Sequence, residues 1–243
     1  MTRLAGGAAL VLLWWLAVVA LRIESYLVPA PPAVLAAFRR HPADLLSAAG
    51  VTLSETVQGF ALAAAAGILL GTALAASEQV ARAMYPALVA LNAVPKLAFA
   101  PLLLVWLGFG AGPKVVLAAL MAFFPIVLAT ATGLGSTPAD LVELARSLTA
   151  SRLQTFWRVR GPAALPHIFV GLKTAMPLAV IGALVGELFG ATAGLGFLIQ
   201  NAGADTALAF AAITLLAALS IALFYVLVAV EHRLAPWVQH TTA

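Results

Sequence analysis

Two ionisable residues, Lys96 and Glu187, lie within or beside long apolar stretches of the chain. A lysine at the centre of a hydrocarbon layer costs about 2.5–3.5 kcal/mol on insertion scales, so Lys96 should face water, an acid or the protein interior. Pro95, directly before it, removes a backbone donor and opens the helix, which is tolerated where a cavity is lined. These residues predict a pathway for an anion. A structural role, with Lys96 bound to freed carbonyls or to Glu187, is the alternative.

Glu187 lies near the outer end of its apolar stretch, before the glycine-rich link "GATAGLGFLIQNAGADT". An acid in this position can gate a pathway, pair with Lys96, or be a hydrated residue of the membrane interface. The sequence leaves these three interpretations open.

Little else in the chain predicts catalytic or metal chemistry. There is no cysteine, which excludes disulfides and cysteine-ligated metals. No Gly-x-x-x-x-Gly-Lys-Ser/Thr segment is present to cradle the phosphates of ATP. Asp140, Glu143 and His167 are the only candidates for a catalytic cluster at the membrane face, and their spacing fits no known site. We therefore expect a chain that is not an enzyme and binds no metal or cofactor. Its histidines are isolated and lack ligand spacing: His41, His167, His232 and His240.

The composition is that of an integral membrane protein. Only 9% of the 243 residues are charged, against about a quarter in a soluble domain, and the mean hydropathy is +1.07. The basic residues are dispersed at segment ends, where they set membrane topology, and this pattern does not indicate nucleic-acid binding.

Six apolar stretches approach the length needed to cross a bilayer, and they predict an all-helical protein with both termini cytoplasmic. The first could instead be a secretory signal, but it lacks a convincing small-x-small cleavage site. A short external helix is expected between Pro32 and His41. From Asp44 the pattern predicts a helix at the membrane interface, with Glu55 on its polar side, before the second span. The predicted spans are 4–21, 57–76, 84–107, 114–134, 168–189 and 207–230.

Basic residues favour this orientation, because eight would lie on the cytoplasmic side and four on the other. The four are Arg22, Arg39, Arg40 and Lys114. The eight are Arg3, Arg82, Arg146, Arg152, Arg158, Arg160, Lys173 and Arg233.

Small residues at four-residue spacing predict close helix packing. Gly67 and Gly71 form one such pair, and Gly182, Gly186, Gly190 and Gly194 form a longer series. The seam could join helices of one chain or two copies of the chain.

The segment 135–167 is charged and doubly amphipathic, and we interpret it as a cytoplasmic loop of two short helices. Thr137 and Pro138 predict the start of the first, which places Leu141, Leu144, Ala145 and Leu148 on one face. Ser151 to Gln154 has the form of a capping box that starts the second, and Pro162 and Pro166 should end it. The pair could lie on membrane lipid, with arginines on lipid phosphates, or dock into a groove on a soluble protein.

This loop resembles the "EAA" loop in permease subunits of bacterial ABC importers: Glu-Ala-Ala, three residues, Gly, nine residues, then Ile-x-Leu-Pro. Glu143, Ala145 and Pro162 match in register. Thr149 replaces the glycine. A glycine there would end the first helix in a left-handed conformation that a β-branched residue tolerates poorly, so we expect another turn geometry or a longer helix.

The resemblance covers nearly the whole chain and is to the nitrate/sulfonate/taurine subgroup of these permeases. It is carried by "LVPAPPAVLAAF", "AVPKLAFAPLLLVWLGFG", "FFPIVLATATGL" and "GELFGATAGLGFLI", in that order. It implies a type I importer fold in the bacterial inner membrane and a homodimer of six-helix subunits. It also implies two cytoplasmic ATPase subunits that bind ATP and Mg, and an extracytoplasmic binding protein. The substrate implied is a small anion such as a sulfonate, taurine or nitrate, although similar permeases serve thiamine-pyrimidine precursors, riboflavin and aromatic carboxylates.

The same resemblance assigns coupling to the loop. Its first helix would sit in a groove on the ATPase, and the fifth span would carry the motion to the pathway. The residues so implied are Asp140, Leu141, Glu143, Leu144, Ala145, Arg146, Ser147, Thr149 and Pro162.

Two other classes of protein remain as alternatives. A secondary transporter should have more spans and a repeated half, and no internal repeat is visible. A membrane enzyme acting on lipid would need the polar cluster that this chain lacks. The first predicts transport without an ATPase, and the second predicts turnover by the purified chain alone.

Overall fold

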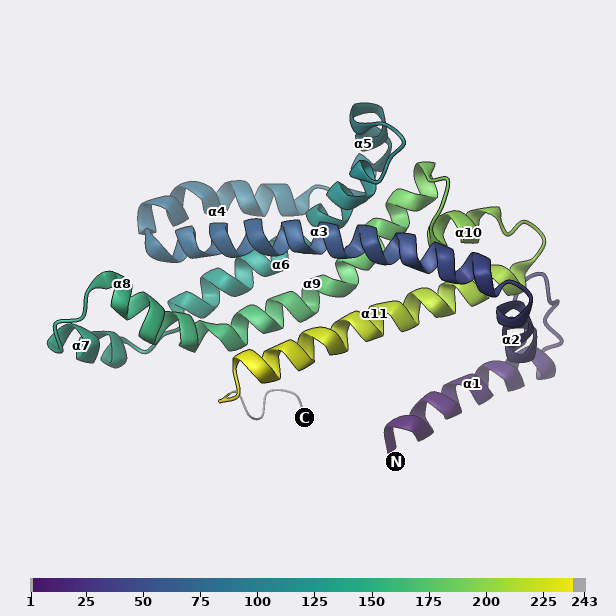
Figure 1. Ribbon diagram of the computed structural model, residues 1–243, viewed down its shortest axis with the longest axis horizontal. Coiled ribbons are helices and arrows are strands. Elements are labelled where there is room, and N and C mark those ends of the chain that lie inside the picture. The colour runs from purple at the N-terminus through teal and green to yellow at the C-terminus, as the bar shows by residue number, and fades with distance from the viewer. Residues whose placement is uncertain (1, 238–243) are drawn as a thin grey trace.

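The computed structural model describes residues 2–237, and within that range it contains helices and no strand. Its longest helices lie side by side along the long axis of the molecule (Figure 1). They are α3 (Pro42–Ala76), α6 (Gly112–Gly135), α9 (Gly161–Gly190) and α11 (Thr206–Leu234). The all-helical fold predicted from composition is therefore confirmed.

Within residues 2–237, four helices are long and apolar enough to cross a membrane, or five if one bent pair is a single span. The bent pair is α4 (Glu78–Ala93) followed by η1 (Lys96–Phe99) and α5 (Ala100–Leu107), with an angle of 77° at the break. The break falls at Val94 and Pro95, where the proline denies the helix a backbone donor. In α1 (Thr2–Ala20), the shorter stretch Val11–Ala20 qualifies as apolar helix.

Helix α3 differs from the prediction, because it is one continuous helix of 35 residues. The interface helix expected from Asp44 and the span expected from Val57 are parts of the same element. The polar residue Glu55 suggested a surface location, but only 3% of it is exposed. A lysine on a neighbouring helix accommodates it inside the bundle, as described below.

Helix α6 lies between α3 and α9, and glycines make both contacts close. A Cβ on Gly71 of α3 would stand 2.6 Å from the Thr130 Cβ, and one on Gly182 of α9 would stand 2.6 Å from the Ala118 Cα. Larger side chains would therefore separate these helices. The predicted glycine seam is confirmed within one chain for the four glycines that contact α6: Gly67, Gly71, Gly182 and Gly186. Gly190 instead faces Leu104 of α5, and Gly194 lies beyond the end of α9.

The second loop helix does not end at Pro162 and Pro166 as predicted. Helix α8 (Arg152–Thr155) continues through a π-helical turn, η2 (Phe156–Arg160), directly into α9. Residues 152–190 form one apolar helical stretch of 39 residues. Pro162 stands in the first turn of α9, where its missing donor costs no hydrogen bond within that helix, and the π turn absorbs the change in geometry.

The loop helices lie at one end of the bundle, and two other short helices lie at the opposite end. Helix α7 (Ala139–Ser147) and α8 lie at one end, next to the turn between α3 and α4 (Figure 1). Helix α2 (Pro31–Arg40), which confirms the helix predicted between Pro32 and His41, lies at the other end with α10 (Leu195–Asn201). Helices α1 and α11 both point their chain-terminal ends away from the α2–α10 end (Figure 1).

Candidate coupling loop and intramembrane charges

Helix α7 presents an apolar face that nothing in the described chain covers fully. Leu141 is 47% exposed, Leu144 is 56% exposed and Leu148 is 71% exposed, whereas Ala145 on the same helix is buried. Leucines at this spacing on a solvent-exposed helix normally pack against another apolar surface. The buried Ala145 therefore packs α7 against the rest of the segment 135–167. The exposed leucines remain available to a partner protein.

Thr149 adopts the left-handed conformation that the sequence argued against, with φ +59°. The Ala150 N–H donates to the Ala145 carbonyl at 3.0 Å, and the Thr149 N–H donates to the Arg146 carbonyl at 2.9 Å. These two bonds make the Schellman motif that ends a helix. The expectation of another geometry was wrong, because the chain keeps the turn although it lacks the glycine. The Thr149 hydroxyl donates to the Leu148 carbonyl at 2.7 Å.

The start of α8 is as predicted, and the start of α7 is not. The Gln154 N–H donates to the Ser151 hydroxyl at 3.2 Å, and the Ser151 N–H donates to the Gln154 side chain at 2.8 Å, which completes the capping box. The Thr137 hydroxyl instead donates back to the Leu134 carbonyl of α6 at 3.5 Å, and Pro138 is the N-cap residue of α7.

The remaining loop residues from the sequence analysis are surface residues of α7 or its neighbours. Asp140 lies in the first turn, where the helix dipole favours an anion, and Arg146 lies in the last turn, where it favours a cation. Asp140, Glu143, Arg146 and Ser147 are all exposed. One cavity of about 790 Å³ is lined by residues of this surface: Thr137, Ala139, Val142, Glu143, Arg146, Ser147 and Arg160.

Lys96 lies at the bend between α4 and η1, so it does not interrupt a straight span. Its ammonium donates to the Asn92 amide oxygen at 2.7 Å, one turn back on α4. The side chain is partly exposed and Pro95 is exposed. The predicted alternative of a Lys96–Glu187 pair is not formed.

Glu187 is completely buried, which excludes the interpretation as a hydrated interface residue in this conformation. One carboxylate oxygen accepts from the Thr52 hydroxyl at 2.6 Å, and the other accepts from the Gly196 N–H at 2.5 Å. The Thr52 hydroxyl also accepts from the Leu195 N–H at 2.9 Å. These groups satisfy the first N–H groups of α10, which a helix start leaves without partners. Thr52 and Glu187 therefore hold α10 against α3 and α9.

Gly194, the N-cap residue of α10, is a glycine for two reasons. Its φ is +109°, a conformation that side chains rarely adopt, and a Cβ there would collide with the Glu187 carboxylate. The glycine-rich link thus brings the backbone within reach of the buried acid.

A buried ion pair near the start of α10 was not predicted from the sequence. The Lys114 ammonium of α6 lies 3.6 Å from a Glu55 carboxylate oxygen of α3 and donates to the Gly110 carbonyl at 2.9 Å. Lys114 is 5% exposed, so it is a buried partner of Glu55 and not a free charge at the end of its helix, whereas the side of the membrane predicted for it stays a prediction. The sequence contained a signal for this pair, because Glu55 and Lys114 are isolated charged residues in apolar helices, and such charges usually pair with one another.

A second buried pair joins α9 to α11. The Lys173 ammonium donates to a Glu231 carboxylate oxygen at 2.7 Å, and each residue is 6% exposed. Lys173 is therefore a buried packing residue whose charge Glu231 compensates, and the side of the membrane predicted for it stays a prediction.

The described residues therefore form a bundle of apolar helices with two buried ion pairs and an amphipathic loop at one end, as in an integral membrane protein. Residues 63–237 match the family described as "Binding-protein-dependent transport system inner membrane component". The chain belongs to this family of ABC importer permeases, which places it in the inner membrane as a transport subunit and not an enzyme.

Several permeases are similar to this protein over most of the chain. A probable ABC transporter permease of Haemophilus influenzae is 35% identical and covers 92% of each chain. The formylaminopyrimidine transport permease ThiX of Halalkalibacterium halodurans is 40% identical over 76% of this chain and 75% of its own. The taurine transport permease TauC of Escherichia coli is 31% identical over 95% of this chain and 87% of its own.

Among solved structures, the MetNI methionine ABC transporter in an inward-facing conformation contains a chain with the same fold. Its TM-score is 0.67 at 20% identity, covering 81% of this chain and 97% of that chain. This confirms the fold expected from the resemblance.

Proposed function

We propose that this chain forms the membrane pathway for a small anion and receives mechanical work through α7 from a cytoplasmic ATPase. The observation that carries the proposal is the exposed leucine face of α7, at the end of the bundle opposite α10. A short helix that displays leucines to solvent fits a groove on a soluble partner. Glu143, also exposed on α7, supplies a polar contact at the edge of that groove.

We infer six crossings with both termini cytoplasmic. The four long helices, the bent pair and α1 supply them. This topology puts α7 and the terminal ends of α1 and α11 on the cytoplasmic side. Helices α2 and α10 then face the external binding protein that delivers the substrate.

Motion would pass from α7 to the pathway through one helix. When two ATPase subunits bind ATP and Mg and close, they would shift α7, which Ala145 and the Thr149 turn fix to the start of α8. Helix α8 continues through η2 into α9 without a break, so the shift would reach α9. At its far end α9 carries Glu187, which holds α10. The two ends of the bundle would thereby alternate between inward-open and outward-open states.

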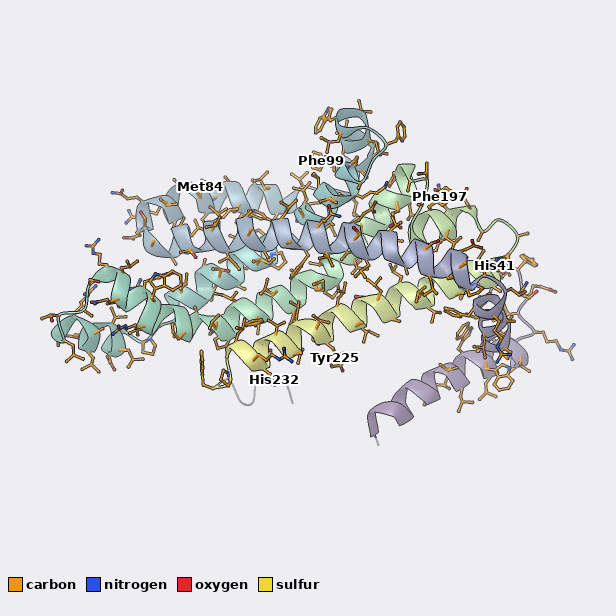
Figure 2. The ribbon with its side chains drawn as sticks, in the orientation of Figure 1. His41, Met84, Phe99, Phe197, Tyr225 and His232 are labelled. Carbon is orange, nitrogen blue, oxygen red and sulfur yellow. The ribbon has the colours of Figure 1, made fainter. Side chains whose placement is uncertain are left out.

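A second copy of this chain would complete the pathway. The arm formed by η1 and α5 projects from the bundle, with Phe99 at its base (Figures 1 and 2). Leu103 and Leu104 face inward, whereas Val105 is 80% exposed and Phe109 is 77% exposed. Exposed apolar groups of this size would contact membrane lipid or the partner copy, and we assign the arm to a homodimer contact.

Lys96 supports an anionic substrate such as a sulfonate, taurine or nitrate. It is the cation at the bend of the broken span, and its partner in the chain is a neutral amide rather than an acid. Its charge therefore remains available to an anion. Pro95 holds the bend open beside it. The relative named for formylaminopyrimidine transport favours a pyrimidine as the second candidate.

Co-purification with a candidate partner ATPase tests the proposal directly. Leu144→Asp puts a charge into the apolar face, and Glu143→Ala removes the polar contact. Glu78→Ala is the matched control, because Glu78 is an exposed acid at the same end of the bundle. We expect ATPase binding to be lost in Leu144→Asp, weakened in Glu143→Ala and kept in Glu78→Ala, with equal protein in the membrane. Full binding by Leu144→Asp would move the contact off α7. No binding by the unaltered chain would count against the importer assembly.

A further inference from the structure

A cavity of about 580 Å³ lies where the ends of α3 and α6 meet the loop helices. Three arginines line it, Arg146 from α7, Arg152 from α8 and Arg160 from η2, and no acidic residue does. The rest of its lining is apolar or small: Thr72, Ala75, Ala76, Leu134, Val142, Ala150, Leu153, Thr155 and Phe156. The cavity therefore offers concentrated positive charge next to apolar walls.

The three arginines have no partner for their charge among the described residues. No carboxylate within residues 2–237 lies within ion-pair distance of Arg146, Arg152 or Arg160. Arg82, at the same end of the bundle, is by contrast paired with Glu78 at 2.6 Å. Like charges drawn from three elements repel one another, so the arrangement is stabilised when an anion enters.

A second cavity, which is apolar, shares one lining residue with the first. It has a volume of about 270 Å³ and lies between α3, α4 and α6. Ala75 lines both cavities, and no charged residue lines the second. Its walls are Leu74, Ala75, Ala81, Tyr85, Leu88, Val89, Phe124, Val127, Leu128, Ala131 and Gly135. A basic cavity and an apolar cavity on either side of one small residue would suit a ligand with an anionic head and a hydrocarbon tail.

We infer that these two cavities bind one anionic phospholipid of the inner leaflet. Its phosphate would lie among Arg146, Arg152 and Arg160, where guanidinium groups donate paired hydrogen bonds to phosphate oxygens. One acyl chain would pass Ala75 into the apolar cavity. Free phosphate would use the arginines alone and leave the apolar cavity without a role. Both cavities are lined by the last turns of α3 and α6, which lie at the cytoplasmic boundary of the bilayer in the topology proposed above, on which this inference rests.

The site would couple lipid composition to the loop. Arg146 belongs to α7, whereas Arg152 and Arg160 belong to the helix that continues into α9. A phosphate held by all three would tie these elements together, independently of what docks on the leucine face of α7. An acidic surface of a soluble protein could use the arginines but not the apolar cavity.

Native mass spectrometry of the full chain in detergent tests this inference, with dioleoyl phosphatidylglycerol and dioleoyl phosphatidylcholine as probes. We expect one phosphatidylglycerol to be retained where phosphatidylcholine is lost. Replacing Arg146, Arg152 and Arg160 with glutamine should weaken that retention by roughly a hundredfold. Arg158→Gln is the matched control, because Arg158 is in η2 but does not line the cavity. It should leave retention unchanged.

Two further measurements keep the result interpretable. Ala75→Leu should reduce phosphatidylglycerol retention without altering competition by inorganic phosphate, because it fills the junction and leaves the arginines. Equal losses in Arg158→Gln and in the triple variant would show general surface attraction and overturn the site. If inorganic phosphate displaced the lipid completely and Ala75→Leu left lipid retention unchanged, the arginine cavity would be a phosphate site. That result would overturn the inference of a bound phospholipid. Circular dichroism of each variant verifies folding, and Ala75→Leu decides the outcome if the triple variant does not fold.

Discussion

The Thr52 hydroxyl of α3 donates to the Glu187 carboxylate of α9 at 2.6 Å while it accepts from the Leu195 N–H of α10. One hydroxyl therefore connects three helices. Because all of these groups are shielded from solvent, losing the hydroxyl would leave a carboxylate oxygen and a backbone N–H without this partner.

Thr52→Val should lower the free energy of unfolding by about 1–3 kcal/mol, because the buried partners lose their hydrogen bonds. Thr56→Val is the matched control. Thr56 lies one turn further along α3, is equally buried, and its hydroxyl has no partner. We expect no loss of stability there. Thermal unfolding in one detergent compares the two variants, and equal effects would show that the Thr52 bonds carry no net stabilisation.

The turn after α7 offers a second comparison. Thr149→Gly should stabilise the loop by about 1 kcal/mol, because glycine adopts φ +59° without the steric cost that a β-branched residue bears. Hydrogen exchange at the Thr149 and Ala150 amides, both bonded within the turn, measures the gain as slower opening. Ala150→Gly is the control and should not slow exchange. Faster exchange in Thr149→Gly would mean that the threonine side chain contributes more than its backbone geometry costs.

The buried pair between α9 and α11 allows a double-mutant test. Lys173→Met alone or Glu231→Leu alone leaves one charge unpaired inside the bundle and should destabilise the protein by about 3–5 kcal/mol. The double variant should be close to the unaltered protein, because two apolar residues replace two charges that compensated each other. Thermal unfolding of all four proteins gives the coupling free energy. If the double variant falls by the sum of the single effects, the pair has no interaction beyond packing.

The sequence allowed the long apolar helices, the helix near Pro32, the capping box and the close glycine contacts to be predicted, because each follows from local periodicity or from residue size. The six membrane crossings stay a prediction. The interface helix before Val57 was wrong for a tertiary reason. Glu55 appeared to mark a surface, but Lys114 on another helix compensates its charge inside the bundle. The pattern of residues within one helix does not show which charged residue of another helix will pair with a buried acid.

The two failures in the loop have a similar origin. Pro162 usually marks a helix end, yet it lies in the first turn of α9, where no helical bond is lost. Thr149 is disfavoured in a left-handed turn, yet the bonds from Thr149 and Ala150 back to α7 hold it there. At Thr149 the capping bonds outweigh a steric preference of about 1–2 kcal/mol, whereas at Pro162 the preceding π-helical turn accommodates the proline. The coupling residues themselves rest on family resemblance, since exposure alone does not name a partner.

Lys96 provides the test of substrate charge. Lys96→Gln keeps a group that can bond to Asn92 and removes the cation, whereas Lys96→Arg keeps the charge. We expect Lys96→Gln to raise KM for import of an alkanesulfonate by about tenfold or more, since a cation concentrates anions along its pathway. Lys96→Arg should stay near the unaltered value, and the difference between the two should shrink as salt screens the charge. The assay uses the permease reconstituted in vesicles with its ATPase and binding protein. Identical import by all three proteins at low salt would remove Lys96 from the pathway and leave it as a structural partner of Asn92.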